Sequence, residues 1–355
     1  MKSFTARARR LARAVAARPR GWSRGRRLLV TALVALGVLA VPVGTAALAL
    51  RLEYAGDPAP QTRTRGRDAV WLGHAWVDGR KSDADVEALA ARLAGTGIRD
   101  LYVHTGPLEH DGSLDSALYP NARWFLGAVH RALPGIRVQS WLGDVMAPEK
   151  EGLHLEQLPV RDRITASAAQ VLDLGFDGVH FDMEPVHSGS AGWLALLDQV
   201  HTVTAARGVP LSVAAPQIDP LPGLHAAGLA LSGHGKWWSQ AYFAQTARRV
   251  EQIAVMSYDT GLPLESLYGG YVAQQTTLAL EVTPPQVDLL MGLPAYWENR
   301  SGHYGSAETV EAAVRGARLA LGREAPQRQA FGLALYVDFT ATPEHWSAYR
   351  RGWVA

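Results

Sequence analysis

The segment from Gly175 to Pro185 places three ionisable side chains at every second position. A glycine turn followed by apolar residues predicts a β-strand, in which alternate side chains share a face. His180, Asp182 and Glu184 therefore point to one side of the predicted strand. The opposite side, which we expect to pack against helices, holds Val179, Phe181 and Met183.

Two carboxylates at the end of a buried strand are suited to acid–base chemistry. Burial makes the charged form of a carboxyl group costly and raises its pKa, and two neighbouring carboxylates push their pKa values apart. A protein can thereby hold a carboxylic acid that donates a proton at neutral pH. Glu184 is the last inward residue of the strand, and we expect it to be that acid. The alternative is that Asp182 caps the following helix and Glu184 lies in solvent.

The elements that position these residues are apolar runs that alternate with amphipathic stretches from Ala69 onward. Eight runs have the length and composition of buried parallel strands, which predicts a (β/α)8 barrel. A doubly wound open sheet is the alternative, and no Gly-x-Gly-x-x-Gly follows the first run to support its nucleotide-binding form. The runs are Val70–Trp76, Leu101–Thr105, Val138–Gly143, Gly178–Met183, Leu211–Ala215, Ile253–Tyr258, Leu289–Pro294 and Gly332–Val337.

The stretches between the runs have the apolar periodicity of helices. We expect the last of the clear examples to begin at Ser306, which has the side chain of an N-cap. The examples are Ala84–Ala94, Ala122–Leu133, Ile164–Leu174, Trp193–Ala206 and Ala307–Leu321.

In a barrel of this type the functional site lies where the strands end at their carboxyl side. Carboxylate and aromatic side chains recur at those positions. Aromatic rings stack on the C–H faces of sugars while carboxylates bind hydroxyl groups, so this set predicts a carbohydrate site. Besides the three residues on the fourth strand, the candidates are Trp76, Trp141, Asp144, Gln217, Tyr258, Asp259, Tyr296, Trp297 and Tyr336.

Other kinds of site find little support in the sequence. The histidines are scattered without the spacing of metal ligands and the chain has no cysteine, so we expect neither a metal ion nor a cofactor. No Gly-x-Ser-x-Gly elbow of a serine hydrolase is present. His74 and His104 follow the first two strands, either as site residues or as structural histidines of the barrel rim.

Three motifs resemble those of glycoside hydrolase family 18, the chitinase-like barrels. The fourth strand of that family carries D-G-x-D-x-D-x-E, and this chain has Asp177-Gly-Val-His180-Phe-Asp182-Met-Glu184. The family's sixth strand carries M-x-Y-D, present here as Met256–Asp259, and its seventh often reads G-L-P-x-Y, present as Gly292–Tyr296. The motifs occur in the family's order and span most of residues 69–352.

The resemblance implies a role for each matched residue. Glu184 would be the general acid and base. Asp182 would orient the 2-acetamido group of the substrate, whose carbonyl oxygen attacks the anomeric carbon. Tyr258 would hydrogen-bond that group, and Asp259 would support the sugar and the acid. Such substrate-assisted cleavage needs no nucleophile from the enzyme, but it requires an N-acetylated sugar at the cleavage site.

Two positions depart from the family pattern. His180 stands where the family has an aspartate that shares a proton with the next one. A neutral imidazole would hydrogen-bond Asp182, whereas an imidazolium would lower the pKa of Asp182. On the eighth strand Tyr336, or Phe339 nearby, replaces the usual sugar-stacking tryptophan, which predicts a different sugar or weaker binding.

The basic net charge of +2 belongs to residues 1–27, which carry ten Lys and Arg and no acidic residue. The rest of the chain is acidic, so nucleic-acid binding is not expected.

Residues 28–50 are uncharged and long enough to span a bilayer, which predicts a membrane anchor preceded by a cytoplasmic tail. A signal peptide cleaved near Ala49 is the alternative. Either way, the domain of residues 69–355 lies outside the cytoplasm, after a linker over residues 51–68.

Together these features predict a monomeric, exported glycoside hydrolase that acts on β-linked N-acetylhexosamine polymers such as chitin, peptidoglycan or an exopolysaccharide. Two other functions remain open. One is a catalytically silent sugar-binding protein on the same barrel. The other is a two-carboxylate glycosidase for neutral sugars, with Asp144, Asp259 or Glu298 as its second carboxylate.

Overall fold

The structure is a computed structural model that describes residues 24–355. The chain divides into two units between Ala49 and Leu50. Residues 24–49 belong to the long helix α2 (Arg24–Glu53). In the part of the chain that the structure describes, no helix has both the length and the apolar character needed to cross a membrane, so the span predicted over residues 28–50 is not found.

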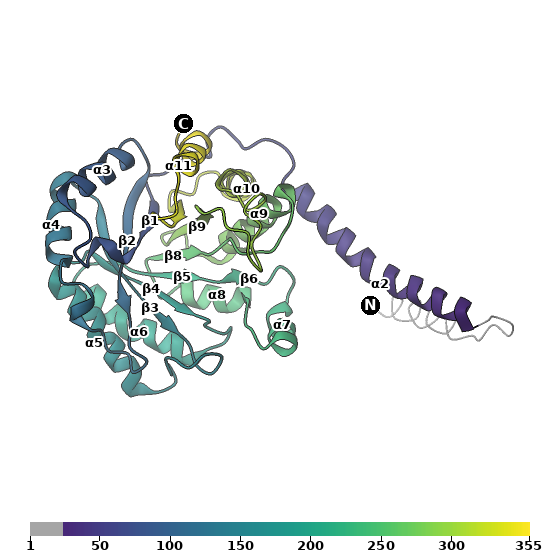
Figure 1. Cartoon of the computed structure of the whole chain (residues 1–355), viewed down its shortest axis with the longest axis horizontal. Helices are drawn as coiled ribbons and strands as arrows, with labels where there is room; N and C mark the ends of the chain where they lie inside the picture. The colour runs from purple at the N-terminus through teal and green to yellow at the C-terminus, as the bar shows by residue number, and fades with distance from the viewer. Residues whose placement is uncertain (1–23) are drawn as a thin grey trace. The chain divides into compact units, whose positions relative to one another are not determined.

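The second unit is built around a closed barrel of eight parallel strands, which confirms the predicted (β/α)8 architecture (Figure 1). Around the barrel the order is β1-β10-β9-β8-β5-β4-β3-β2, so each strand lies beside its neighbours in sequence. Each of the eight predicted apolar runs forms one strand. The strands are β1 (Asp68–Leu72), β2 (Ile98–Pro107), β3 (Arg137–Val145), β4 (Gly178–Glu184), β5 (Leu211–Ala215), β8 (Gln252–Val255), β9 (Asp288–Pro294) and β10 (Phe331–Tyr336).

A helix follows each barrel strand and covers its outer side (Figure 1). An extra segment between β5 and α8 contains the short strands β6 (Gln217–Ile218) and β7 (Trp237–Trp238) on either side of α7 (Leu224–Ser232). The helices that cover the barrel are α3 (Asp83–Leu93), α4 (Ala122–Ala132), α5 (Leu158–Leu174), α6 (Ala191–Ala206), α8 (Gln240–Ala247), α9 (Glu265–Val282), α10 (Val310–Glu324) and α11 (Pro343–Tyr349), and short helical turns occupy His74–Trp76, Ser116–Leu118 and Arg350–Val354.

At three of the predicted boundaries that were wrong, a side chain binds the backbone where the element begins or ends. β1 ends at Leu72, since the N–H of Gly73 binds the carboxylate of Asp338. β8 ends at Val255, and the side-chain amide of Gln217 then binds the carbonyls of Met256 and Tyr258. Helix α10 begins after Thr309, not Ser306, and the Thr309 hydroxyl accepts a hydrogen bond from Ala312 N–H.

Strand β4 has the predicted alternation. Val179, Phe181 and Met183 are buried in the apolar layer between the strands and the helices. His180 and Asp182 face the barrel interior instead. There small residues such as Ala214 and Ala254 leave room for a few large aromatic rings and for polar groups.

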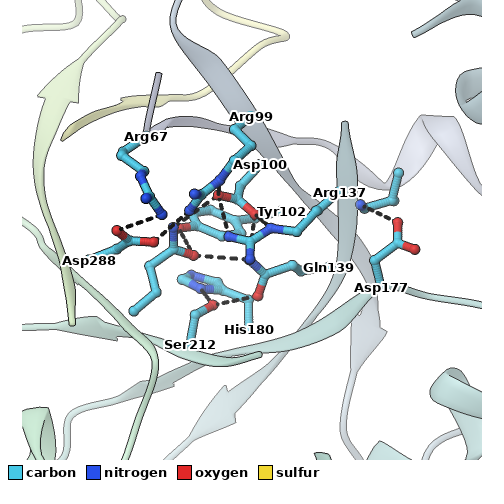
Figure 2. A network of polar contacts seen from close by, with 12 residues as sticks. Arg67, Arg99, Asp100, Tyr102, Arg137, Gln139, Asp177, His180, Ser212 and Asp288 are labelled. Carbon is cyan, nitrogen blue, oxygen red and sulfur yellow. Dashed lines mark hydrogen bonds and ion pairs between the residues drawn. The ribbon is translucent and has the colours of Figure 1, made fainter. Parts of the chain in front are cut away.

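A polar network fills the interior near the start of the strands (Figure 2). The buried carboxylate of Asp100 accepts two hydrogen bonds from Arg137, at 2.7 and 2.8 Å, and one each from Gln139 and Gln252. Burial alone would raise the pKa of Asp100, but the Arg137 guanidinium holds it below its usual value. A buried charge is tolerated only when it is paired and hydrogen-bonded in this way.

A second buried carboxylate, that of Asp68, joins the two ends of the barrel domain. It accepts hydrogen bonds from Thr64 Oγ1 at 2.5 Å, Leu333 N–H at 2.7 Å, Tyr349 Oη at 2.8 Å and Trp353 Nε1 at 2.9 Å. Burial raises the pKa of Asp68 although these donors oppose the shift.

The segment before β1, predicted as a linker over residues 51–68, makes further contacts with the barrel domain. The carbonyl of Thr62, which is fully buried, accepts a hydrogen bond from Arg318 at 2.6 Å. Arg323 binds the carbonyls of Glu53 and Ala55. Several residues of the segment are therefore held in place by α10.

We expect Asp68→Ala to lower the free energy of unfolding by at least about 3 kcal/mol, because four buried donors lose their acceptor together. Urea denaturation of the variant and the parent protein gives this difference. Asp57→Ala is the control, since that side chain is fully exposed, and we expect a change within about 0.5 kcal/mol. Equal losses in the two variants would contradict the role of Asp68.

Candidate active site

Strands β3 and β4 bring the two predicted catalytic carboxylates to the carboxyl end of the barrel, called the mouth below. Gly143 of β3 lies opposite Asp182, and Val145 lies opposite Glu184. A Cβ atom on Gly143 would lie 2.2 Å from the Asp182 carbonyl oxygen, so only glycine permits this close approach. The alternation of β4 then directs both carboxyl groups into the mouth.

The surroundings of Asp182 favour its protonated form. The side chain is partly buried, and Oδ1 accepts no hydrogen bond from any residue that the structure describes. Burial raises the pKa of Asp182 well above its usual value, the negative charge of Glu184 raises it further, and a hydrogen bond from Trp141 opposes the shift. Asp182 therefore needs either a proton or a donor from a bound ligand.

Glu184 lies at the end of β4 and is accessible to solvent. The protein atoms packed around its carboxyl group nevertheless raise its pKa, and the charge of Asp259 raises it further. His234 acts in the opposite direction. A solvent-accessible carboxyl group that keeps its proton above the usual pH range has the properties of a general acid.

Aromatic rings form one wall beside the carboxyl pair. Tyr336 stacks on Tyr258 with ring centroids 5.3 Å apart, and it also contacts Trp141, Tyr296 and Trp71 edge-on at 5.6 to 6.3 Å. Burial raises the pKa of Tyr336 to about 12, with Asp182 and Glu184 adding to the shift. The Tyr336 hydroxyl therefore keeps its proton at neutral pH and can donate a hydrogen bond.

Asp259 is held from several sides. Its carboxylate accepts hydrogen bonds from the Tyr296 hydroxyl at 2.9 Å and from the Arg300 guanidinium at 2.8 Å. Its backbone has a φ of +55°, a left-handed conformation that costs a residue with a Cβ about 1 kcal/mol or more. Lys236 donates to the carbonyls of Asp259 and Thr260, at 3.2 and 3.4 Å, and so binds the turn that this conformation creates.

Gln217 braces the end of β8 and does not face the mouth. Its amide nitrogen binds two backbone carbonyls there, and its oxygen accepts a hydrogen bond from Tyr271 at 3.0 Å. The residue is buried with all these partners within the protein. Gln217 was predicted to contact the substrate, but its side chain instead holds the backbone at Met256 and Tyr258.

His180 is fully buried below Asp182 and does not form the hydrogen bond to Asp182 that the sequence led us to expect. Trp71 Nε1 donates to His180 Nε2 at 3.0 Å, so Nδ1 carries the proton and donates to Ser212 Oγ at 2.7 Å. Figure 2 shows the ring stacked on Tyr102, with a centroid separation of 3.8 Å. Burial lowers the pKa of His180 to about 3, so the imidazole is neutral. Its expected contact with substrate is excluded by this burial.

The remaining predicted residues lie around the rim of the mouth. The Trp76 indole donates to Asp338 at 2.7 Å. Asp144 binds His110 at 2.8 Å. Trp297 is half-exposed and stacks on His345 with ring centroids 4.4 Å apart. The contacts described for these three residues do not include the group formed by Asp182, Glu184, Tyr258, Asp259, Tyr296, Tyr336 and Trp141.

Sequence reasoning missed several residues that meet beside Glu184. Glu149, from the loop after β3, binds His187 at 2.8 Å and also binds His234, and the Gly235 N–H donates to the same carboxylate. Lys236 follows directly and binds the Asp259 turn. These residues come from three loops with no regular spacing, so no sequence pattern indicates that they meet. Among residues 24–355, no group of three or more His, Asp or Glu is arranged to hold a metal ion.

Comparison with known proteins supports the fold assignment. Two spore cortex-lytic enzymes, both called SleL, have a similar fold over most of this chain. The one from Bacillus cereus is 12% identical with a TM-score of 0.58, covering 82% of this chain and 75% of its own. The one from Bacillus megaterium is 14% identical with a TM-score of 0.59, and the match covers 83% of this chain and 76% of the SleL chain. A chitinase from Chromobacterium violaceum is 14% identical with a TM-score of 0.55, and the match covers 80% of this chain and 98% of the chitinase chain.

No family model and no curated protein matches the sequence. At these identities the similarity concerns the fold alone. The class is therefore a (β/α)8 barrel with its carboxyl groups at the mouth. Within that class, the fold is similar to that of the Chromobacterium chitinase and of the two SleL enzymes.

We expect His180→Gln to change how stability depends on pH. The pKa of His180 is about 3 in the folded protein and near 6.5 when unfolded, so the unfolded chain binds one more proton between these values. The free energy of unfolding is therefore highest above pH 6.5 as far as this group is concerned. It falls by about 1.4 kcal/mol for each pH unit as the pH drops from 6.5 toward 3. Urea unfolding at several pH values should show this slope in the difference between parent and variant. Parallel curves would exclude a buried neutral histidine.

We expect Lys236→Met to release the turn at Asp259, because the two carbonyls lose their charged donor. In a crystal structure of the variant, the φ angle of Asp259 should leave the left-handed region, and stability should fall by about 1–3 kcal/mol. Lys236→Arg is the matched control and should keep the turn. An unchanged Asp259 in the methionine variant would show that Tyr296 and Arg300 suffice to hold it.

Proposed function

We propose that this protein is a glycoside hydrolase that cleaves N-acetylhexosamine glycans with Glu184 as the general acid. The observation that carries the proposal is the pair of carboxyl groups on β4. Glu184 is accessible and has a raised pKa, while the buried Oδ1 atom of Asp182 lacks a donor and faces the mouth. The aromatic wall of Tyr258, Tyr336 and Trp141 beside the pair suits the C–H face of a sugar ring.

The missing donor for Asp182 points to an amide N–H on the substrate. An acetamido group whose N–H binds Asp182 Oδ1 would place its carbonyl oxygen near the anomeric carbon. The carbonyl oxygen forms a bond to that carbon, the glycosidic bond breaks, and the Glu184 proton passes to the leaving oxygen. Water then opens the cyclic intermediate and gives a proton back to Glu184. The tyrosine hydroxyls, protonated at neutral pH, are available as donors to the sugar.

The direction of the pKa shift of Glu184 sets the pH dependence. The acid must be protonated to act, and its pKa is raised. Activity should therefore be retained above the usual range of a carboxyl group and be lost as the pH rises through the raised pKa. His180 is neutral throughout this range and should not contribute to the profile.

We expect Glu184→Gln to fold normally and to lose at least about a hundredfold in kcat on chromogenic N-acetylglucosamine oligomers, because no proton reaches the leaving oxygen. Turnover is measured between about pH 4 and 8 beside the parent protein. Glu298→Gln, an exposed carboxylate in the loop after β9, is the control and should stay within about twofold.

Near-parent activity of Glu184→Gln would reject the assignment of the acid. A thiazoline that mimics the cyclic intermediate should inhibit the parent protein. Turnover that the thiazoline does not inhibit would favour a two-carboxylate glycosidase. Binding of the oligomers without turnover by the parent protein would favour a sugar-binding protein.

A further inference from the structure

A cleft of about 540 Å³ lies between α3 and α11, beside the segments that follow β1 and β10. Its lining includes His74 and Trp76, which follow β1, and Phe339, which follows β10. Arg92 of α3 and Trp346 of α11 also line it. The cleft contains residues from outside the proposed catalytic group, and none of the chemistry described above uses it.

Cations line this cleft beside aromatic rings. Lys81 Nζ lies 5.0 Å from the centre of the Trp76 ring, and the Arg92 guanidinium lies 5.9 Å from that of Trp346. Arg92 makes no ion pair or side-chain hydrogen bond with any residue that the structure describes. Its five N–H donors therefore have no acceptor from the protein within that range. Arg80 also lines the cleft and is largely exposed, although it pairs with Asp78.

The acidic residues of the cleft already have partners. Asp338 accepts hydrogen bonds from Gly73 N–H at 2.8 Å and from Trp76 Nε1 at 2.7 Å. Burial also raises the pKa of Asp338. Asp85 accepts hydrogen bonds from the backbone N–H and the hydroxyl of Ser82, as part of the cap of α3, and pairs with Lys81 at 3.4 Å. Arg92 and the remaining donors of Lys81 are thus left to meet an acceptor from outside the protein.

An aromatic path connects the cleft with the catalytic carboxyl groups. The His74 ring lies 5.5 Å from that of His104, which lies 4.8 Å from Trp141, and Trp141 binds Asp182. Burial lowers the pKa of His104 to about 4, so this part of the path is neutral at physiological pH. Phe339, whose side chain is 70% exposed, adds an open ring face at the entrance of the cleft. Sugars that extend from the mouth past the partly exposed rings of His104 and His74 would approach Lys81 beside Trp76.

We propose that the cleft lined by Lys81, Arg92 and Phe339 binds an acidic residue of the glycan, so that the substrate is an N-acetylhexosamine polymer carrying carboxylate or phosphate groups. The inference rests on the proposed function, since it takes the occupant of the mouth to be a glycan. The exposed ring of Phe339 supplies contact with the sugar ring, and the cations supply charge-assisted hydrogen bonds to its acidic group. Nucleic acid is disfavoured because the domain as a whole is acidic.

The test compares three tetramers of equal length on the full chain carrying Glu184→Gln, which prevents turnover during the measurement. The probes are the neutral tetramer of N-acetylglucosamine, the same tetramer phosphorylated at O6, and the alternating tetramer of N-acetylglucosamine and N-acetylmuramic acid, which carries carboxylates. Isothermal titration calorimetry gives the three Kd values. We expect at least one acidic tetramer to bind about tenfold more tightly than the neutral one, and the tighter of the two identifies the acidic group.

The excess affinity must depend on the cations of the cleft. It should disappear in the double variant Lys81→Gln/Arg92→Gln, while the Kd of the neutral tetramer stays unchanged. It should persist in Arg207→Gln, which removes an exposed arginine on another part of the surface. It should also shrink when the salt concentration rises from about 0.02 to 0.3 M, because ions screen the attraction.

Three results would overturn the inference: equal affinity for the neutral and acidic tetramers, excess affinity that survives in the double variant, or binding of none of the tetramers. Thermal melting shows whether the double variant is folded, and Arg92→Lys offers a milder change that keeps the charge. Turnover by the parent protein is measured separately. Tighter binding of an acidic tetramer without turnover would reject the proposed hydrolase activity but support the acidic subsite in the cleft. Turnover without tighter binding of an acidic tetramer would reject the acidic subsite alone.

Discussion

Polar groups inside a closed barrel lose their contact with bulk water, so hydrogen-bond partners inside the barrel are needed to stabilise them. In this chain that requirement connects the Asp100 network to the catalytic strand. Gln139 binds Asp100 and accepts a hydrogen bond from Ser212, which in turn accepts one from His180. The other ring nitrogen of His180 is occupied by Trp71. Because both nitrogens have partners, the imidazole forms no hydrogen bond with Asp182, whose Oδ1 is left for a proton or a donor from a ligand.

The fold and the carboxyl pair could be predicted from the sequence because both depend on local patterns. The eight apolar runs are long enough to be recognised one by one, and the period of two in β4 already separates the helix-facing Val179 and Phe181 from the inward Asp182. The errors concern the ends of elements. At β1 and β8 the chain leaves the barrel because Asp338 and Gln217, distant in sequence, bind the backbone where the ladder would have continued.

The surroundings of the site could not be predicted in the same way. Lys236, His234 and Glu149 meet through three loops whose lengths carry no periodic signal, and the turn at Asp259 is recognisable only from its backbone angle. The departure of His180 from the motif was visible in the sequence, but its neutral state follows from burial, and its hydrogen bonds with Trp71 and Ser212 follow from the fold. The cleft beside β1 is likewise a product of tertiary structure, since Arg92 and Trp346 are separated by most of the domain.

The carboxylate of Asp68 has a consequence for how the protein is made. Its partners include Thr64, close before it in the sequence, and Leu333, Tyr349 and Trp353, which leave the ribosome long after it. During synthesis the first barrel strand therefore carries a charged group that cannot be buried at low cost until the last strand and the helices after it have emerged. A chain that stops short of these elements leaves the Asp68 carboxylate in water at the start of an otherwise apolar first strand.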